Sequence, residues 1–193
     1  MKTLLFASSN INKLKELQQI TGEDYNIKGL REINFLGEIP ETQDTIEGNA
    51  LQKAQFLYER IQTNCFADDT GLEVEALNGA PGVHSARYAG KSKDDAANVK
   101  KLLKELEDKS NRKARFKTVI ALIFKGKEYT FEGIINGHIA QAPKGDSGFG
   151  YDPVFIPDNY DKSFAELDSE EKNRISHRAL AVQKLADFLE KQK

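Results

Sequence analysis

The sequence predicts an α/β fold in which helices flank a mixed β-sheet, and two observations carry this prediction. In the first part of the chain, short apolar runs alternate with segments whose apolar residues recur at helical spacing. Later, two long apolar-rich runs flank the short turn Lys125–Lys127, as in an antiparallel hairpin. Parallel strands joined through helices and an antiparallel hairpin together give a mixed sheet.

The first elements follow from the N-terminal third. Thr3–Ala7 is a short apolar run that predicts a strand, and the polar residues Ser8–Asn10 end it. A helix should follow, because Leu14 and Leu17 share one helical face. A second strand is predicted near Tyr25–Leu30, before a loop rich in acidic residues.

Two further helices are predicted in the middle of the chain. The first runs from about Glu47 to Ile61, and the second from Asp95 to Leu106. Both carry apolar residues at helical spacing. Between them, Cys65–Ala67 predicts a short strand.

The last third combines the hairpin with a closing helix. Its strands should cover Arg115–Phe124 and Tyr129–Ile139, and the helix about Arg174 to Glu190. The helix is expected to bury Leu180, Leu185, Phe188 and Leu189. Because no repeat or low-complexity linker interrupts the chain, we expect a single domain over residues 1–193.

The composition of the chain limits its function. A hydrophobic content of 39% and a charged content of 30% are ordinary for a globular protein. The formal net charge of −2 argues against a basic sheath for nucleic acid, although it allows a local pocket for a small anion. The single Cys65 cannot form an intramolecular disulfide, and Leu4–Ala7 is too short for a signal or membrane segment. We therefore expect a cytoplasmic protein that binds no membrane.

The N-terminal turn "FASSNINKLKEL" could bind phosphate. It passes from a strand through a small polar loop into a helix. The free N–H groups at such a helix start, with Lys13 one turn in, suit an anion. The alternative is a helix with an ordinary Ser or Asn cap.

The adjacent acids Asp68 and Asp69 raise a question, because like charges repel. A divalent cation is the simplest group that would hold them. If the strand persists to this pair, successive residues face opposite sides, so only one carboxylate can face a given site and the other must serve the scaffold. The alternative is that both cap turns.

Two late stretches complete the candidate chemistry. "GFGYDPVF" offers a flat ring at Phe149 and an acceptor at Asp152, with glycines that allow close backbone approach. "EEKNRISHRALAV" brings Lys172, His177 and Arg178 to a helix start. Their alternatives are an aromatic-anchored surface loop and a solvated charged face.

These stretches, in this order, resemble the inosine/xanthosine triphosphate pyrophosphatases over nearly the whole chain. "ASSNINKLKEL", "ADDTGLEVEALNGAPGVHSARYAG", "GFGYDPVF" and "EKNRISHRALA" match the family's motifs. The resemblance implies an elongated two-lobed fold with a central substrate cleft, a homodimer, and Mg²⁺-assisted hydrolysis of ITP, dITP and XTP to monophosphate and pyrophosphate.

The resemblance also implies roles for individual residues. Asp69 corresponds to the general base and a metal ligand, and Glu41 to a second metal carboxylate. His177 and Arg178 correspond to the base-recognition pair. The other implied substrate contacts are Ser8, Ser9, Asn10, Ile11, Asn12, Lys13, Lys53, Thr70, Phe149, Gly150, Tyr151, Asp152 and Lys172.

This sequence departs from the family in the segment "ETQDTIEGNA" and at Thr70. Gln43 replaces a usual glycine, Gly48 a usual glutamate, and Thr70 a usual serine. Two alternatives to the implied activity stay open. One is the same chemistry on a modified pyrimidine nucleotide, and the other is a nucleotide-binding regulator without catalysis.

Overall fold

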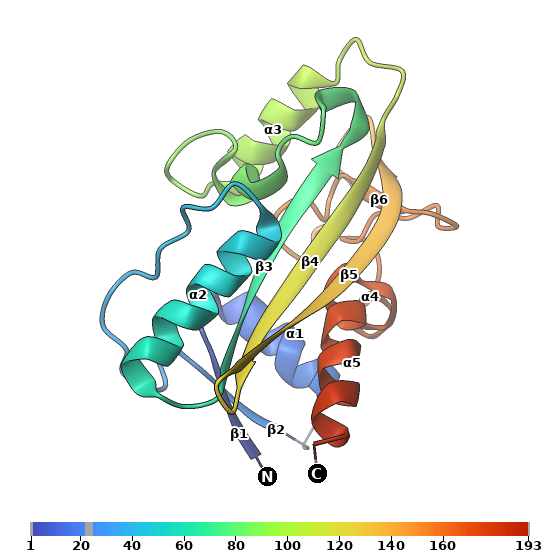
Figure 1. Cartoon of the computed structure of the whole chain (residues 1–193). Coiled ribbons are helices and arrows are strands. Elements are labelled where there is room, and N and C mark those ends of the chain that lie inside the picture. Colours follow the sequence, from blue (N-terminus) through green and yellow to red (C-terminus); the bar gives the residue numbers. More distant parts are fainter. Residues whose placement is uncertain (1, 22–24, 193) are drawn as a thin grey trace. The chain divides into compact units, whose positions relative to one another are not determined.

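The computed structural model describes residues 2–21 and 25–192. Within them the strands form one sheet in the order β2-β1-β3-β4-β5-β6 (Figure 1). The strands are β1 (Lys2–Phe6), β2 (Tyr25–Gly29), β3 (Cys65–Val74), β4 (Lys113–Phe124), β5 (Lys127–Ile139) and β6 (Phe155–Pro157). The helices are α1 (Ile11–Thr21), α2 (Ile46–Ile61), α3 (Asp95–Glu105), α4 (Ser169–Ile175) and α5 (His177–Glu190), with short 3₁₀ turns at Glu75–Leu77 and Gly82–Arg87.

The predicted mixed sheet is confirmed. β1 pairs in parallel with β2 and with β3, whereas β5 pairs antiparallel with β6. β4 and β5 form the predicted hairpin through Lys125 and Gly126, whose φ angles are 52° and 74°. Two successive positive φ angles are those of the two-residue turn that fits the twist of a hairpin.

The chain divides into two compact units. We call residues 1–69, 118–133 and 177–193 the first unit, and residues 70–117 and 134–176 the second unit. β3, β4 and β5 each contribute residues to both. The prediction that the units form one domain with a substrate cleft stays a prediction.

In the first unit, helices cover both faces of the strands, with α2 in front and α1 behind (Figure 1). Alternation along β3 sorts its side chains between the two faces. Phe66 packs in a core with residues of α1 and α5, while the Cys65 thiol donates to the Ala54 carbonyl of α2. That core contains Leu4, Phe6, Leu17, Tyr25, Ile27, Phe66, Ile120, Leu122, Ala181, Val182, Leu185 and Leu189.

The second unit has its own core. Aromatic rings of β4, β6 and the segment after β6 meet there, with 4.7 Å between the ring centroids of Phe116 and Phe155 and 5.2 Å between those of Phe155 and Phe164. α3 adds Leu102, which is fully buried. Burying an apolar side chain of this size stabilises the fold by about 1.5–3 kcal/mol.

Two expectations about the C-terminal helix were wrong. The helix expected from Arg174 to Glu190 is two helices, because Ser176 adopts an extended conformation between α4 and α5. Apolar spacing continues through Ser176, so the pattern alone shows no break. Leu180 is 41% exposed, since it lies on the face of α5 that also exposes Gln183, Lys184 and Asp187.

β3 also extends further than the predicted Cys65–Ala67, to Val74. The acids and the glycine that follow Ala67 are poor strand formers, and among the described residues β1 pairs only with Cys65 and Phe66, but β4 is the neighbour of β3 on its other side in the sheet. In the part of the chain that is described, no helix is long and apolar enough to cross a membrane.

Candidate active site

The two acids of β3 face opposite sides of the first unit. Asp68 continues the side of Phe66, toward α1 and α5, and Asp69 continues the side of Cys65, toward α2. This is the alternation expected of neighbouring strand residues. The two carboxylates therefore have different partners and need no shared cation between them.

Asp68 binds two cations. Its Oδ1 lies 2.9 Å from Lys13 Nζ, and its Oδ2 lies 3.6 Å from Arg178 Nε. Burial opposes ionisation of this carboxyl, but the charges of Lys13 and Arg178 outweigh that penalty and hold its pKa at about 2. The sequence left open which acid serves the scaffold; Asp68 does so by fixing these two cations.

Asp69 shares the ammonium group of Lys53 with Glu41. Lys53 Nζ lies 2.9 Å from Asp69 Oδ1 and 2.8 Å from Glu41 Oε1. Burial raises the pKa of Asp69, and the positive charge of Lys53 offsets only part of that effect. For Lys53 the balance is reversed: burial opposes the charged form, but Asp69 and Glu41 outweigh it, so its pKa is raised. Lys53 therefore stays charged, and Asp69 is a stronger base than an ordinary aspartate.

The N-terminal loop differs in one respect from the phosphate-binding loop that the sequence predicted. Asn10 caps α1, and its Oδ1 accepts the N–H groups of Asn12 and Lys13 at 3.0 and 3.2 Å. Ser8 Oγ in turn accepts the N–H of Asn10. Two N–H groups that the sequence predicted to be free are thus bound to a side chain. Ser9, Asn10, Ile11 and Asn12 remain exposed at this helix start.

Arg178 and His177 begin α5 and are both buried. The guanidinium of Arg178 donates to Glu16 of α1 as well as facing Asp68. Sequence reasoning missed Glu16, although its place three residues after Lys13 on one helical face could have suggested it. Gly133 of β5 allows α5 to come close, since a Cβ at this position would lie 2.0 Å from the His177 carbonyl oxygen.

The second unit brings together Phe149, Asp152 and Lys172. Asp152 Oδ2 accepts from Lys172 Nζ and from the N–H of Phe149, both at 2.8 Å. Lys172 Nζ also lies 5.1 Å from the centre of the Phe149 ring, within cation–π range. Lys172, which the sequence placed in a separate stretch, thus contacts both Asp152 and Phe149.

Backbone geometry explains the glycines of this loop. Gly148 has a φ of +81°, and a Cβ there would lie 2.2 Å from Asp152 Oδ2. Gly150, with a φ of +64°, donates its N–H to Asp95 of α3, which sequence reasoning did not single out. The buried Tyr151 donates its hydroxyl to the Ser85 carbonyl, so it anchors the loop. Thr70 follows Asp69 in β3 and is half-buried.

Asp69 and Glu41 fit the carboxylate ligands of magnesium. Mg²⁺ in proteins is commonly held by one or two carboxylates together with substrate phosphates and water. Both carboxylates bind one ammonium group, so their oxygens converge. The described residues contain no group of three or more His, Cys, Asp or Glu that could hold a metal ion.

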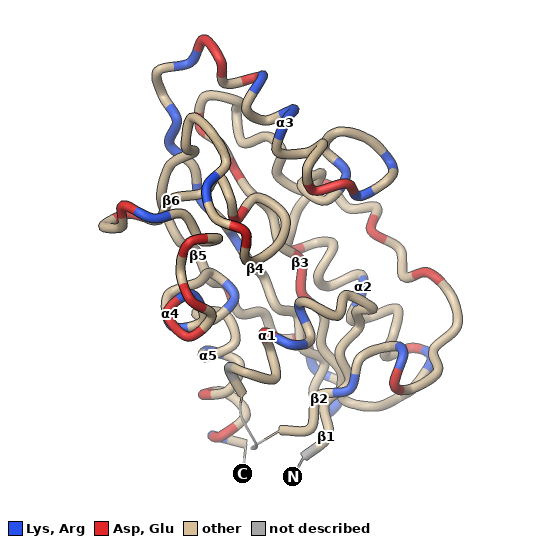
Figure 2. The backbone as a smooth tube through the Cα atoms, turned by 180° about the vertical axis from the view of Figure 1, so that it is seen from behind, with Lys and Arg blue, Asp and Glu red and all other residues tan. Residues whose placement is uncertain are grey.

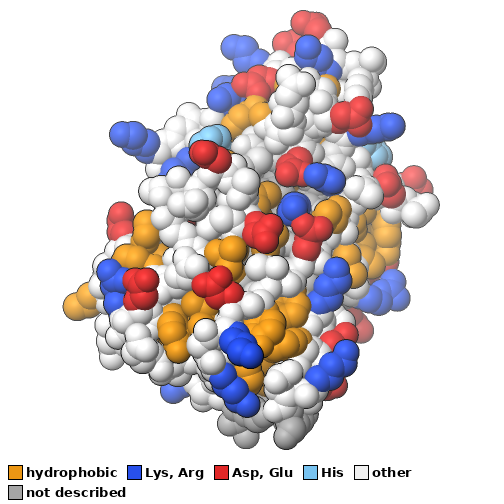
Figure 3. All heavy atoms as spheres, in the orientation of Figure 1, with side chains coloured by type: hydrophobic (Ala, Val, Ile, Leu, Met, Phe, Trp, Pro, Cys, Tyr) orange, Lys and Arg blue, Asp and Glu red, His pale blue; other side chains and the backbone are white. Residues whose placement is uncertain are grey.

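Figure 2 shows Lys and Arg interspersed with Asp and Glu along the backbone. On the face of the molecule that Figure 3 shows, charged side chains do not gather by sign. On the face seen in Figure 3, side chains of opposite charge lie next to one another. A basic stripe of the kind that binds nucleic acid is not visible there.

Comparison with known proteins gives one consistent result. The model of the Ham1 family matches residues 4–188. A dITP/XTP pyrophosphatase of Porphyromonas gingivalis is 56% identical, with 98% of each chain covered. The one of Flavobacterium johnsoniae is 55% identical over 96% of this chain and 97% of its own. Among solved structures, the Ham1 protein of Staphylococcus aureus is 40% identical with a TM-score of 0.91, and 100% of each chain is covered.

Proposed function

The chain belongs to the Ham1 family, and on that basis we propose that it hydrolyses ITP, dITP and XTP to the nucleoside monophosphate and pyrophosphate. Relatives named dITP/XTP pyrophosphatase are 46–56% identical to it over nearly their whole length. This activity removes deaminated purines from the nucleotide pool.

The observation that carries the proposal is the arrangement of charged groups around Asp68 and Asp69 in the middle of β3. Three cationic side chains there each form an ion pair with at least one carboxylate, and they are Lys13, Lys53 and Arg178. Four carboxylates contact them, those of Asp68, Asp69, Glu41 and Glu16. The cluster therefore has no excess positive charge, whereas a nucleoside triphosphate carries about four negative charges at neutral pH. We therefore propose that Mg²⁺ accompanies the substrate, held by Asp69 and Glu41.

Asp69 is the proposed proton acceptor for the water that attacks the α-phosphorus. An ordinary aspartate has a pKa of about 4, far below the value of about 15.7 for bulk water. The raised pKa of Asp69 makes the difference between the pKa values of the base and of water smaller. Magnesium, when bound, would lower the pKa of the water and offset phosphate charge.

Lys13 and Lys53 would stabilise the negative charge that grows on the departing pyrophosphate. Lys53 is well suited to this, because its acidic partners keep it protonated. Asp68 keeps Lys13 in place through the 2.9 Å ion pair. The reaction needs no covalent nucleophile. Burial raises the pKa of the Cys65 thiol to about 12, so it is not a thiolate at neutral pH.

Base selectivity is proposed to come from hydrogen-bond donors. Hypoxanthine and xanthine present an acceptor oxygen at position 6, where adenine presents a donor. His177 and Arg178 carry donors, and Glu16 and Asp68 fix the guanidinium of Arg178. A site of this kind can discriminate by about 10⁴-fold or more. Phe149 to Asp152, Lys172 and Thr70 are proposed for the remaining substrate contacts.

The test is pyrophosphate release from ITP, XTP, GTP and ATP, with and without magnesium. We expect strong release from ITP and XTP that chelation abolishes. Equal release from all four nucleotides would overturn the proposed base selectivity. Nucleotide binding without any release would support a non-catalytic regulator, and faster release from UTP or dTTP, assayed beside ITP, would support the pyrimidine alternative.

We also propose a cytoplasmic location and a homodimeric state, both in line with the resemblance. The single cysteine suits a reducing compartment. Sedimentation equilibrium at micromolar concentration would decide the oligomeric state.

A further inference from the structure

The segment that carries Glu41 has no regular secondary structure, so something else must fix it. Residues 41–45 lie between the loop after β2 and the start of α2. Glu41 nevertheless reaches Lys53, twelve residues further along the chain, at 2.8 Å. In the proposed function this carboxylate holds magnesium, so its position matters to within a fraction of an ångström.

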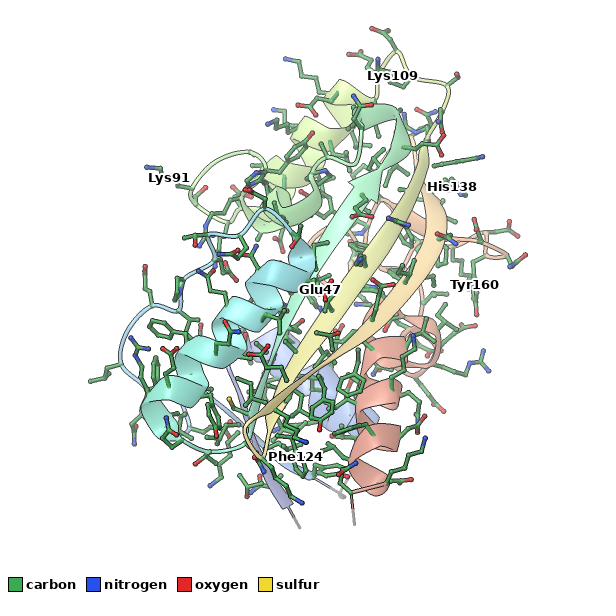
Figure 4. All side chains as sticks on the ribbon, viewed as in Figure 1. Glu47, Lys91, Lys109, Phe124, His138 and Tyr160 are labelled. Carbon is green, nitrogen blue, oxygen red and sulfur yellow. The ribbon has the colours of Figure 1, made fainter. Side chains whose placement is uncertain are left out.

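The first two turns of α2 hold this segment by hydrogen bonds. Gln52 accepts the N–H of Thr42 at 2.9 Å and donates to the Thr42 hydroxyl at 2.8 Å. Asn49, which is 4% exposed, accepts the N–H of Gln43 at 2.9 Å. Asn49, Gln52 and Lys53 lie on one face of α2, because residues three and four apart are neighbours on a helix. Glu47, on the turn where α2 begins, is labelled in Figure 4.

Gly48 adds a steric element. A Cβ at this position would lie 2.9 Å from Gln43 Cβ, 2.9 Å from Thr45 Oγ1 and 3.3 Å from Gln43 Cγ. Because Gln43 Cβ is fixed to the backbone, relief would require the segment itself to move. Gly48 sits inside a helix with an ordinary negative φ, where alanine would normally be more stable. The close approach of Gln43 and of the Thr45 hydroxyl to Gly48 explains why glycine stands there.

We propose that Gly48, Asn49 and Gln52 are positioning residues that hold Glu41 beside Lys53 and Asp69. This inference rests on the proposed metal role of Glu41. The two departures from the family pattern are also linked, because Gln43 packs directly against Gly48. The side chain of Gln43 occupies the space that a side chain at position 48 would need.

The main test is Gln52→Ala, with Gln55→Ala as the matched control. Gln55 lies on the same helix, and its amide donates to Glu128 rather than to the Glu41 segment. We expect Gln52→Ala to raise the magnesium concentration for half-maximal pyrophosphate release from ITP by about fivefold to tenfold, the effect of losing one or two hydrogen bonds. The kcat at saturating magnesium should stay within about twofold. Gln52→Glu, which keeps an acceptor for Thr42, should recover most of the loss.

Amide hydrogen exchange without metal gives a readout independent of activity. Exchange of the peptide that covers residues 38–46 should become faster in Gln52→Ala and stay unchanged in Gln55→Ala. Gly48→Ala should show both effects, and the double variant Gln43→Gly/Gly48→Ala should reverse the part of the steric effect that comes from Gln43, while the contact with Thr45 Oγ1 remains. An unchanged magnesium requirement in active Gln52→Ala would overturn the positioning role alone. Failure of the unaltered protein to release pyrophosphate would overturn the proposed function, and this inference with it.

Discussion

Replacing Asp68 with asparagine should destabilise the protein far more than the same change at Asp69. Asp68 is 2% exposed, and it pairs with Lys13 at 2.9 Å and with Arg178 at 3.6 Å. Its pKa of about 2, against about 4 in an unfolded chain, corresponds to about 2.5 kcal/mol of stability at neutral pH. Removing one partner of a buried ion pair costs about 3–5 kcal/mol, because the remaining charge is left without compensation.

The assay is urea unfolding of Asp68→Asn and Asp69→Asn at pH 7. We expect a loss of about 2–5 kcal/mol for Asp68→Asn, a large part of the 5–15 kcal/mol that is typical of whole domains. For Asp69→Asn we expect less than about 1 kcal/mol, because burial already works against its ionised form. Equal losses in the two variants, or a loss below about 1 kcal/mol for Asp68→Asn, would refute the reasoning.

The pH dependence gives a second arm to this prediction. Because the folded pKa of Asp68 is lowered, its contribution is fully present above the unfolded pKa of about 4. It is lost as the pH falls from about 4 to about 2, where the folded protein also takes up the proton. Asp68→Asn should therefore show a shallower loss of stability across this pH range than the unaltered protein.

Three further predictions concern the same unit. Asp69→Asn should keep its fold and lose pyrophosphate release from ITP; activity near that of the unaltered protein would exclude Asp69 as the proton acceptor. Lys53→Met should move the acid limb of kcat/KM to higher pH, because Lys53 lowers the pKa of Asp69; a pH–rate profile with an unchanged limb would mean that another group titrates there. Gly133→Ala should lower the free energy of unfolding by about 1–3 kcal/mol or more, since its Cβ would overlap the His177 carbonyl oxygen; an unchanged urea midpoint would contradict the close packing of α5 on β5.

Periodicity predicted those features of the fold that depend on one element at a time. The alternation of strands and helices, the hairpin turn at Gly126 and the long α2 all follow from local patterns. The break at Ser176 does not, because apolar spacing continues through it while the backbone turns. β6 was also missed, since three residues in an aromatic loop carry no period.

In the candidate site, too, local patterns predicted some features, while others depend on contacts between distant parts of the chain. Alternation along β3 predicted that Asp68 and Asp69 face different sides, and the structure confirms it. It could not predict their partners, because Lys13 and Arg178 are 165 residues apart and meet at Asp68 only after α1 and α5 pack together. Phe149, Asp152 and Lys172 became a contact group in the same way, through the fold of the second unit.

Glu41 shows why departures from a motif should be weighed together rather than position by position. Taken singly, Gln43 and Gly48 each weaken the match of this segment to the metal-binding pattern. In the structure, the space above Gly48 is filled by Gln43, and Asn49 holds the backbone of Gln43 from the next helical position. Glu41 still meets Lys53, and Lys53 meets Asp69. The two replacements thus fit together sterically, so Glu41, which precedes both of them, keeps its 2.8 Å contact with Lys53 although two later positions of the segment have changed.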